Sequence, residues 1–390
     1  MTPAKIKTKI PLFDLKLSSE AKKEVAEVLK SGWLSSGPKV AAFEKGIGKA
    51  TKVQHVAAVS SGTAGLFLAL KALDIKEGDE VITTPFTFVA TIEVILHVGA
   101  SPVLADIDPA TLNISCEEIQ RKITERTKAI MSVDMAGYPA DYENLNKLSL
   151  AHSLKIISDS AHSFGATYEG KAMPLWTDAT VYSFYSTKNV TSAEGGAVVS
   201  RRQETIDKVR LLAKHGLTSN AYDRQISGGW KYDAPILGYK ANMSDVHAAI
   251  GLGELANFAA NQKKKVKLVE QYFKLLEPVK ELIRLPQVET NCEHAWHLFI
   301  VQLELEKLGI SRNEFIDEMS KHGIECGVHY QPVFELSYYN SFFSLSLDKY
   351  PHAARAGQRV VTLPLYPLLK VSEVDLICEA IIEILNINSR

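Results

Sequence analysis

The feature that most constrains the fold is a series of short β-rich runs between residues 53 and 200, with helix-like segments between several of them. The runs read HVAAVSS, EVITTP, SPVLADI, KAIMSVDM, KIISDS, ATVYSF and GGAVVS. The helix-like segments include residues 64–73 and the stretch after Pro139. Strands that alternate with helices predict a largely parallel sheet covered on both faces. Ligands are then expected at the carboxyl ends of its strands.

After Gly238 the pattern changes, and the spacing of apolar residues predicts a long helix over 244–277 with Ser244 as its N-cap. The rest of the chain predicts a strand at 297–305, a helix at 311–322, an aromatic loop at 329–343 and a final helix at 371–385. A chain of 390 residues exceeds the usual size of one hydrophobic core. We therefore expect a large domain over residues 1–245 and a smaller α+β domain over 246–390.

Composition excludes several partners. The chain has 44 Lys and Arg against 45 Asp and Glu, so its net charge of -1 draws it neither to nucleic acid nor to anionic lipid. The four cysteines are scattered, without a CxxC pair or a metal-ligand grouping, which suits buried structural thiols in a reducing compartment. With neither a signal-like N-terminus nor a membrane-length apolar run, the sequence favours a cytoplasmic protein.

A run of small residues, SSGTAG at 60–65, joins a predicted strand to a predicted helix. Small residues let backbone N–H groups approach an anion, and the helix N-terminus favours negative charge. Thr63 offers a further hydroxyl donor. A plain tight turn with an N-cap is the alternative interpretation.

Two other glycine-containing segments resemble nucleotide-binding motifs only superficially. Residues 165–172, GATYEGKA, resemble a P-loop, but Ala172 lacks the magnesium-binding hydroxyl and Pro174 falls where a helix should run. Gly251 and Gly253 lie inside a helical pattern, so no dinucleotide fingerprint follows a strand. The sequence therefore argues against a P-loop enzyme and against a nicotinamide dehydrogenase.

Two loops that follow predicted strands carry candidate catalytic groups. Asp159 ends the run KIISDS, where a carboxylate could pair with a cationic ring nitrogen, and His162 follows it closely. Lys188 stands in SFYSTKN, between two apolar strands, where desolvation would favour the neutral, nucleophilic amine. Taken singly, an N-cap aspartate, a packed core histidine and a solvated lysine are the simpler interpretations.

Aromatic residues mark two further candidates. Phe88, at a strand-to-helix junction in TPFTFVAT, suits either stacking on a cofactor ring or filling the core. His329 and Tyr330, in GVHYQP, suit either a substrate contact or an edge strand.

Together and in order, these blocks resemble the DegT/DnrJ family of sugar aminotransferases. The resemblance runs over nearly the whole chain and rests on GWLSSGP, SSGTAGL, GDEVITTPFTFVAT, DSAHSFGA, SFYSTKNVTSAEGGAVVS, GYKANMSDVHAAI, AWHLF and LPLYP. It implies an α/β fold of type I among pyridoxal-phosphate (PLP) enzymes. Such a fold has a large domain with a mostly parallel seven-stranded sheet and a smaller α+β C-terminal domain.

The resemblance also implies roles for single residues. Lys188 matches the Schiff-base lysine, Asp159 the partner of the pyridinium nitrogen, and Phe88 the ring that stacks on the cofactor. The matched phosphate-binding positions are Thr63, the amide of Ala64, and Ser183. His162 stands where many relatives have glutamine near the phenolic oxygen of the cofactor.

The block GYKANM departs from the common family pattern G-[YF]-N-[YF]-R-[ML], in which the asparagine reaches the cofactor phosphate of the neighbouring subunit. Lys240 stands in place of that asparagine, and a lysine can still donate to a phosphate. This variant and KNVTSAEGG resemble the enzymes that make 4-amino-4-deoxy-L-arabinose on UDP.

The function implied is transfer of an amino group, with glutamate as donor, to C4 of a UDP- or dTDP-linked keto sugar for cell-surface polysaccharide or lipopolysaccharide synthesis. The resemblance also implies a homodimer with shared active sites. A C3 aminotransferase of the same family is the nearest alternative, and a non-catalytic PLP-binding regulator is another. Related sugar dehydratases carry histidine at the lysine position, so Lys188 argues against them.

Overall fold

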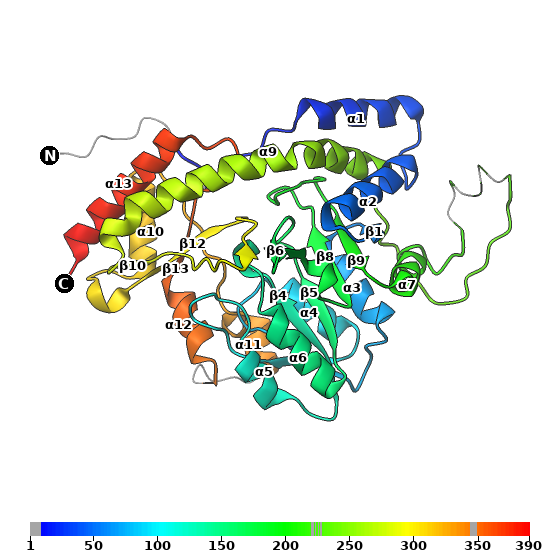
Figure 1. Cartoon of the computed structure of the whole chain (residues 1–390), viewed down its shortest axis with the longest axis horizontal. Coiled ribbons are helices and arrows are strands. Elements are labelled where there is room, and N and C mark those ends of the chain that lie inside the picture. Colours follow the sequence, from blue (N-terminus) through cyan, green and yellow to red (C-terminus); the bar gives the residue numbers. More distant parts are fainter. Residues whose placement is uncertain (1–8, 220–221, 223, 225, 227, 344–348) are drawn as a thin grey trace.

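A single large sheet forms the centre of the structure, a computed structural model that describes residues 9–219, 222, 224, 226, 228–343 and 349–390 (Figure 1). Its strand order is β1-β9-β8-β5-β4-β2-β3. The strands are β1 (His55–Val59), β2 (Glu80–Thr83), β3 (Ser101–Leu104), β4 (Thr127–Val133), β5 (Lys155–Asp159), β8 (Ala179–Ser183) and β9 (Gly196–Ser200). Strand β9 runs antiparallel to both neighbours, and the other pairs are parallel. The predicted β-rich runs therefore form one mostly parallel sheet, as expected.

Helices cover both faces of this sheet, because successive strand residues point to opposite sides. Val81 and Ala129 pack with one set of helices, and Ile82 and Ile130, which follow them in sequence, pack with another. The first set comprises α3 (Gly62–Ala72), α4 (Ala90–His97) and α7 (Gln203–Ala213). The opposite face carries α2 (Pro38–Thr51), α5 (Cys116–Lys122) and α6 (Tyr142–His152).

The long helix α9 (Asp245–Leu276) extends from the large sheet to the C-terminal part of the chain (Figure 1). The hydroxyl of Ser244 accepts a hydrogen bond from the His247 N–H at 3.3 Å, which confirms the predicted cap. Helix α1 (Ser19–Ser31) lies so close that a Cβ added at Gly253 would come within 2.1 Å of the Ala21 nitrogen. The predicted domain boundary falls where α9 begins, and the division at residue 245 stays a prediction.

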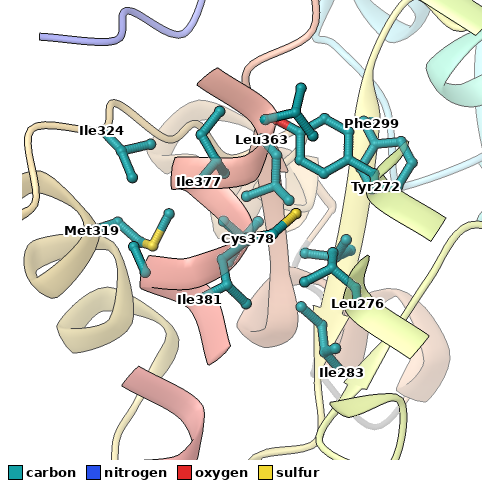
Figure 2. Packing of buried hydrophobic residues seen from close by; sticks show 14 of the residues in the cluster. Tyr272, Leu276, Ile283, Phe299, Met319, Ile324, Leu363, Ile377, Cys378 and Ile381 are labelled. Carbon is teal, nitrogen blue, oxygen red and sulfur yellow. The ribbon is translucent and has the colours of Figure 1, made fainter. Parts of the chain in front are cut away.

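A second core holds the C-terminal part together (Figure 2). Its sheet has the order β10-β12-β13, with β10 (Ile283–Arg284), β12 (Phe299–Leu303) and β13 (Val360–Leu363). Helices α10 (Arg312–Lys321) and α13 (Val371–Asn388) pack on it together with the second half of α9. Ile10, from the N-terminus, joins the same core and donates its N–H to the Gly323 carbonyl at 2.8 Å.

Two expectations are corrected. The predicted aromatic loop contains helix α11 (Ser337–Phe343), which at seven residues is too short to show a clear helical period in the sequence. Two of the four cysteines, Cys116 and Cys326, are only partly buried, whereas Cys292 and Cys378 are buried as expected. The P-loop-like segment forms a hairpin of β6 (Thr167–Tyr168) and β7 (Lys171–Ala172) and does not lead into an α-helix, which agrees with the rejection of a P-loop. Helix α12 (Pro351–Arg359) directly precedes β13.

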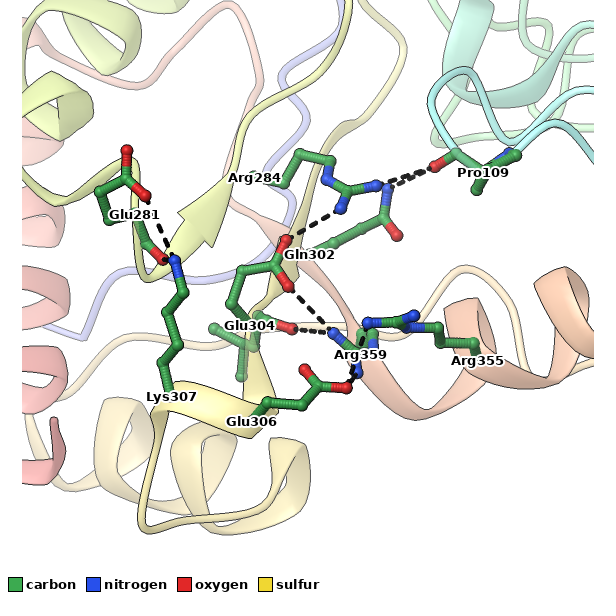
Figure 3. Close-up of polar contacts among 10 residues, drawn as sticks. Pro109, Glu281, Arg284, Gln302, Glu304, Glu306, Lys307, Arg355 and Arg359 are labelled. Carbon is green, nitrogen blue, oxygen red and sulfur yellow. Dashed lines mark hydrogen bonds and ion pairs between the residues drawn. The ribbon is translucent and has the colours of Figure 1, made fainter. Parts of the chain in front are cut away.

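An ion-pair network connects the β10-β12-β13 sheet to the loop that follows β3 (Figure 3). Arg359 is 7% exposed and contacts the carboxylates of Glu304, at 3.1 Å, and Glu306. Glu304 also pairs with Arg284 at 2.9 Å, and Arg284 and Gln302 both donate to the Pro109 carbonyl oxygen. Arg359 is therefore the buried centre of the network.

The variant Arg359→Met is expected to lower the free energy of unfolding by about 1–3 kcal/mol, because two carboxylates lose a shared, desolvated partner. Arg355→Met is the matched control, since Arg355 contacts the same Glu306 at 3.1 Å from a side chain that is 58% exposed. Its loss is expected to stay below about 0.5 kcal/mol. Urea unfolding measures both, and equal losses would contradict the assignment of Arg359 as the centre.

Candidate active site

A cavity of about 600 Å³ opens at the carboxyl ends of the parallel strands, where the fold predicts a ligand site. The large sheet supplies its floor through residues at the ends of β5 and β8, and the start of α3 supplies one wall. Residues from the C-terminal part and the N-terminal segment close it, including Leu12, His297, Tyr330 and Thr362. The site therefore lies between the two hydrophobic cores.

Lys188 lies in the loop between β8 and β9 and lines this cavity. Its amine nitrogen, Nζ, is 3.4 Å from Nε2 of His297. Burial lowers the pKa of Lys188 to about 8, and the nearby carboxylate of Asp159 acts in the opposite direction. About a tenth of this amine is therefore neutral and nucleophilic at pH 7, far more than for an ordinary lysine.

Asp159 is the last residue of β5 and is 6% exposed. Its carboxylate accepts hydrogen bonds from the Thr91 hydroxyl at 2.7 Å and from the Ala161 N–H at 3.2 Å. Burial raises the pKa of this carboxyl, and the two hydrogen bonds work against that rise. A cationic group placed beside it would stabilise the ionised form further.

The N-terminus of α3 faces the same cavity. Ser61 is its N-cap, and its hydroxyl accepts a hydrogen bond from the Ala64 N–H at 3.0 Å. Ser61, Gly62, Thr63 and Ser183 all line the cavity. A Cβ added at Gly62 would lie 2.9 Å from the Ser183 Cβ, so glycine is needed for this close approach. The positive end of the helix dipole and two serine hydroxyls thus form an anion-binding wall.

Three imidazoles crowd around Lys188. His162 and His297 are buried with ring centroids 4.5 Å apart, and burial is the main cause that lowers both pKa values well below the ordinary histidine value. Burial also lowers the pKa of His329 to about 4. All three rings are therefore neutral at pH 7. The Tyr330 hydroxyl lies 3.1 Å from Nε2 of His162, while Nδ1 of His162 has no hydrogen-bond partner among the described residues.

Phe88 stands at the cavity with 55% of its surface exposed and its ring centroid 6.0 Å from that of Tyr330. The structure brings the predicted site residues together with two exceptions. Ala64 lies behind the wall and uses its amide on Ser61, and Lys240 is exposed outside the cavity, where it forms a backbone bridge with Lys214.

Sequence reasoning missed two residues of the site. Ser61 directly precedes α3, which begins two residues before the predicted helix, and the capping preference of serine is the signal that could have identified its N-cap role. His297 lies in the block AWHLF, but only the folded chain places it beside Lys188.

The cavity lining carries little positive charge. Among the described cavity-lining residues, Lys188 is the single Lys or Arg.

The sequence and the fold have clear relatives. Residues 16–382 match the DegT/DnrJ/EryC1/StrS aminotransferase family. The chain is 38% identical over 97% of its length to the uncharacterized protein MJ1066 of Methanocaldococcus jannaschii, of which it covers 98%. It is 39% identical over 94% of its length to the spore coat polysaccharide biosynthesis protein SpsC of Bacillus subtilis, of which it covers 95%.

Solved structures agree with the fold. The PLP form of the putative sugar aminotransferase Spr1654 from Streptococcus pneumoniae superposes with a TM-score of 0.88 at 31% identity, over 98% of this chain and 99% of that one. Helicobacter pylori PseC, an aminotransferase of pseudoaminic acid biosynthesis, gives 0.87 at 27% identity, over 97% and 100%. The chain belongs to the DegT/DnrJ/EryC1/StrS aminotransferase family and is a pyridoxal-phosphate-dependent enzyme of fold type I.

Proposed function

We propose that this enzyme transfers an amino group from glutamate to C4 of a keto sugar carried on UDP or dTDP, for polysaccharide or lipopolysaccharide synthesis. The observation that carries the proposal is that Lys188, Asp159 and the N-terminus of α3 share one cavity in a chain of an aminotransferase family. The names of Spr1654 and SpsC support a sugar substrate and a polysaccharide pathway. The preference for C4 and for UDP rests on the blocks GYKANM and KNVTSAEGG.

The residues present fit pyridoxal phosphate. Lys188, a half-buried residue with a desolvated amine, would provide that amine for its aldehyde, and Asp159 a buried carboxylate for its ring nitrogen. The wall of Ser61, Thr63 and Ser183 at the α3 N-terminus suits its phosphate. The buried Nδ1 of His162 lacks a partner within the described chain, as expected of an atom that a bound group would meet. When bound, the cofactor supplies an electron-withdrawing ring for the electron pair released at the reacting carbon.

Asp159 and Lys188 take complementary roles in this proposal. The buried carboxylate of Asp159 holds a proton on the ring nitrogen, since a positive charge there offsets the cost of burying the anion. Lys188 would hold the cofactor through its amine until the amine of the donor takes its place, and the freed amine would then move a proton at the reacting carbon. Its lowered pKa suits it to accept that proton near neutral pH.

The remaining cavity residues orient the reactants. The exposed ring of Phe88 would hold the cofactor ring by stacking, and His162, whose Nε2 lies 3.1 Å from the Tyr330 hydroxyl, would meet its phenolic oxygen. His329, fixed by a 2.8 Å hydrogen bond between its Nδ1 and the Thr362 hydroxyl, faces the substrate together with Tyr330.

A homodimer with shared sites completes the proposal. The described cavity lining offers no cation but Lys188, whereas a phosphate cofactor and a nucleotide diphosphate both carry negative charge. The segment that includes Lys240 also exposes Trp230, at 78%, and Leu237, at 88%. A second copy would cover these apolar side chains and bring Lys240 to the phosphate of its partner.

None of the described helices could span a membrane. We place the reaction in the cytoplasm, where the thiols of the chain stay reduced.

Lys188→Ala is expected to abolish covalent attachment of the cofactor and to lower the transamination rate about a thousandfold or more, because the residue that moves the proton is gone. Visible absorbance of the purified protein measures attachment, and amino-acid turnover measures the rate. Lys49→Ala, on the exposed surface of α2, is the control and should match the parent in both. Full turnover in the Lys188 variant would place the reactive amine elsewhere.

The capture of added cofactor by cofactor-free enzyme is expected to depend on pH with a midpoint near 8. The folded pKa of Lys188 is lowered, so the neutral, reactive amine accumulates as pH rises toward about 8. The capture rate should rise about tenfold per unit well below this midpoint and level off above it. Stopped-flow absorbance measures it, and a midpoint near 10.5 would contradict a desolvated lysine.

The substrate is tested by incubating the enzyme with glutamate, pyridoxal phosphate and a panel of UDP- and dTDP-linked 4-keto and 3-keto sugars, with products identified by NMR. The expected product carries its new amine at C4. Amination at C3 alone would support the alternative aminotransferase. Cofactor binding without any change in absorbance on addition of glutamate would support a non-catalytic binding protein and overturn the proposal for this donor.

A further inference from the structure

Lys265 is a buried lysine that does not line the cavity. It lies on α9 and is 4% exposed, although the adjacent Lys263 and Lys264 are exposed. Its amine donates to Oδ1 of Asn189 at 2.7 Å, to the Trp296 carbonyl oxygen at 2.9 Å and to the Ala295 carbonyl oxygen at 3.4 Å. These three acceptors match its three donors, and all of them are uncharged.

An ammonium group in such surroundings is costly. Burial lowers the pKa of Lys265 to about 7, which shows how strongly the site disfavours its charge. A methionine of similar length would fill the same space without that penalty. The lysine is therefore better explained by what its hydrogen bonds hold in place than by a contribution to stability.

The three acceptors belong to the two loops that meet at the reactive amine. Asn189 directly follows Lys188, and its own amide donates to the Ala295 carbonyl oxygen at 2.8 Å. Trp296 directly precedes His297 and has a backbone φ of 48°, a left-handed conformation that side chains larger than glycine rarely adopt. The hydrogen bond from Lys265 holds the Trp296 carbonyl in that conformation.

Residues 294–297 form a bend, and helix α9 also contacts it through a second side chain. Gln262, one turn before Lys265, donates to the Ala295 carbonyl oxygen at 2.8 Å. The rings of His294 and Trp296 stack with centroids 3.8 Å apart, and the Trp296 N–H donates to Nδ1 of His294 at 2.8 Å. The bend at residues 294–297 is thus fixed on two sides, and it directs His297 toward the cavity.

We propose that Lys265 is a positioning residue, which joins the loop carrying Lys188 to the loop carrying His297 so that the amine and the imidazole meet. The contact it supports is the 3.4 Å approach between Nζ of Lys188 and Nε2 of His297. His297 meets the amine as a neutral ring, since burial and then the charges of Lys188 and other neighbours, among them Lys265, lower its pKa. A neutral Nε2 can accept a hydrogen bond from the lysine and fix its direction.

The amine has several other titratable neighbours, and any measurement on it must allow for them. The described groups whose charges interact with Lys188 or that line the cavity beside it are Asp159, His162, Tyr185, Glu194, His297, His329 and Tyr330. Lys265 does not line the cavity and touches Lys188 only through Asn189 and the 295–297 segment. Its effect on the amine must therefore pass through the position of these loops.

The test measures the titration of Lys188 in the full-length, cofactor-free chain. Acetic anhydride labels neutral amines, and peptide mass spectrometry follows the labelling of Lys188 across pH. In Lys265→Met the loops are expected to separate, water to reach the amine, and the labelling midpoint of Lys188 to rise by about one pH unit from its parent value. Lys264→Met, one residue earlier and exposed, is the matched control and should leave the midpoint unchanged.

A second variant changes the other partner of the hydrogen bond between Lys265 and Asn189. Asn189→Ala removes the acceptor of the 2.7 Å hydrogen bond without replacing the buried lysine, and it should shift the midpoint in the same direction. In a His297→Phe background, Lys265→Met should shift the midpoint less than it does in the parent, because both changes act on one contact. Equal shifts in the two backgrounds would overturn the role of His297.

The outcome also separates a positioning role from a purely structural one. An unchanged Lys188 midpoint in both variants, with only the urea unfolding midpoint altered, would overturn the proposal. The inference rests on the proposed role of Lys188, but the labelling uses neither cofactor nor sugar. Loss of the Lys188 role would appear as transamination by Lys188→Ala, whereas loss of the Lys265 role would appear as an unshifted labelling curve.

Discussion

The structure depends on holding one lysine amine out of water beside one buried carboxylate. Desolvation alone lowers the pKa of Lys188 and raises that of Asp159, so each group by itself disfavours its charge. Their mutual attraction opposes both shifts. An amine that is partly neutral and a carboxylate that is poised to meet a cation are what aminotransferase chemistry requires. The Thr91 hydroxyl fixes the carboxylate of Asp159, and Nε2 of His297 contacts the amine of Lys188.

Neither half of the chain could make this environment alone. The parallel sheet delivers Asp159 and Ser183 to one edge, but that edge of an open sheet is accessible to water. The C-terminal part closes it with His297, His329 and Tyr330, and helix α9 connects the two cores as one continuous element of 32 residues. A long helix is stiff, which lets residues on its second half fix loops of the catalytic cavity.

Much of the fold was predictable because its signals are local. The β-rich runs became the strands of the sheet, and Ser244 became a helix cap, since both follow from short-range preferences. The seven-residue helix α11 was not predicted, because it is shorter than the window in which a helical period can be recognised. Most of the site could be assigned by resemblance. The place of His297 could not, because it depends on a left-handed Trp296 and on contacts between residues more than 70 positions apart.

Because the three histidines of the cavity are neutral, positive charge for binding phosphate groups must come from elsewhere. Burial keeps His162, His297 and His329 uncharged, so they direct protons and hydrogen bonds without competing with Lys188 for positive charge. The same neutrality leaves the described lining short of cations for phosphate groups. In the proposed homodimer, the exposed Lys240 of a second subunit would supply that positive charge. The cavity itself offers the α3 N-terminus and serine hydroxyls to an anion, and a cation from a second subunit would add to them without placing another charge beside the amine.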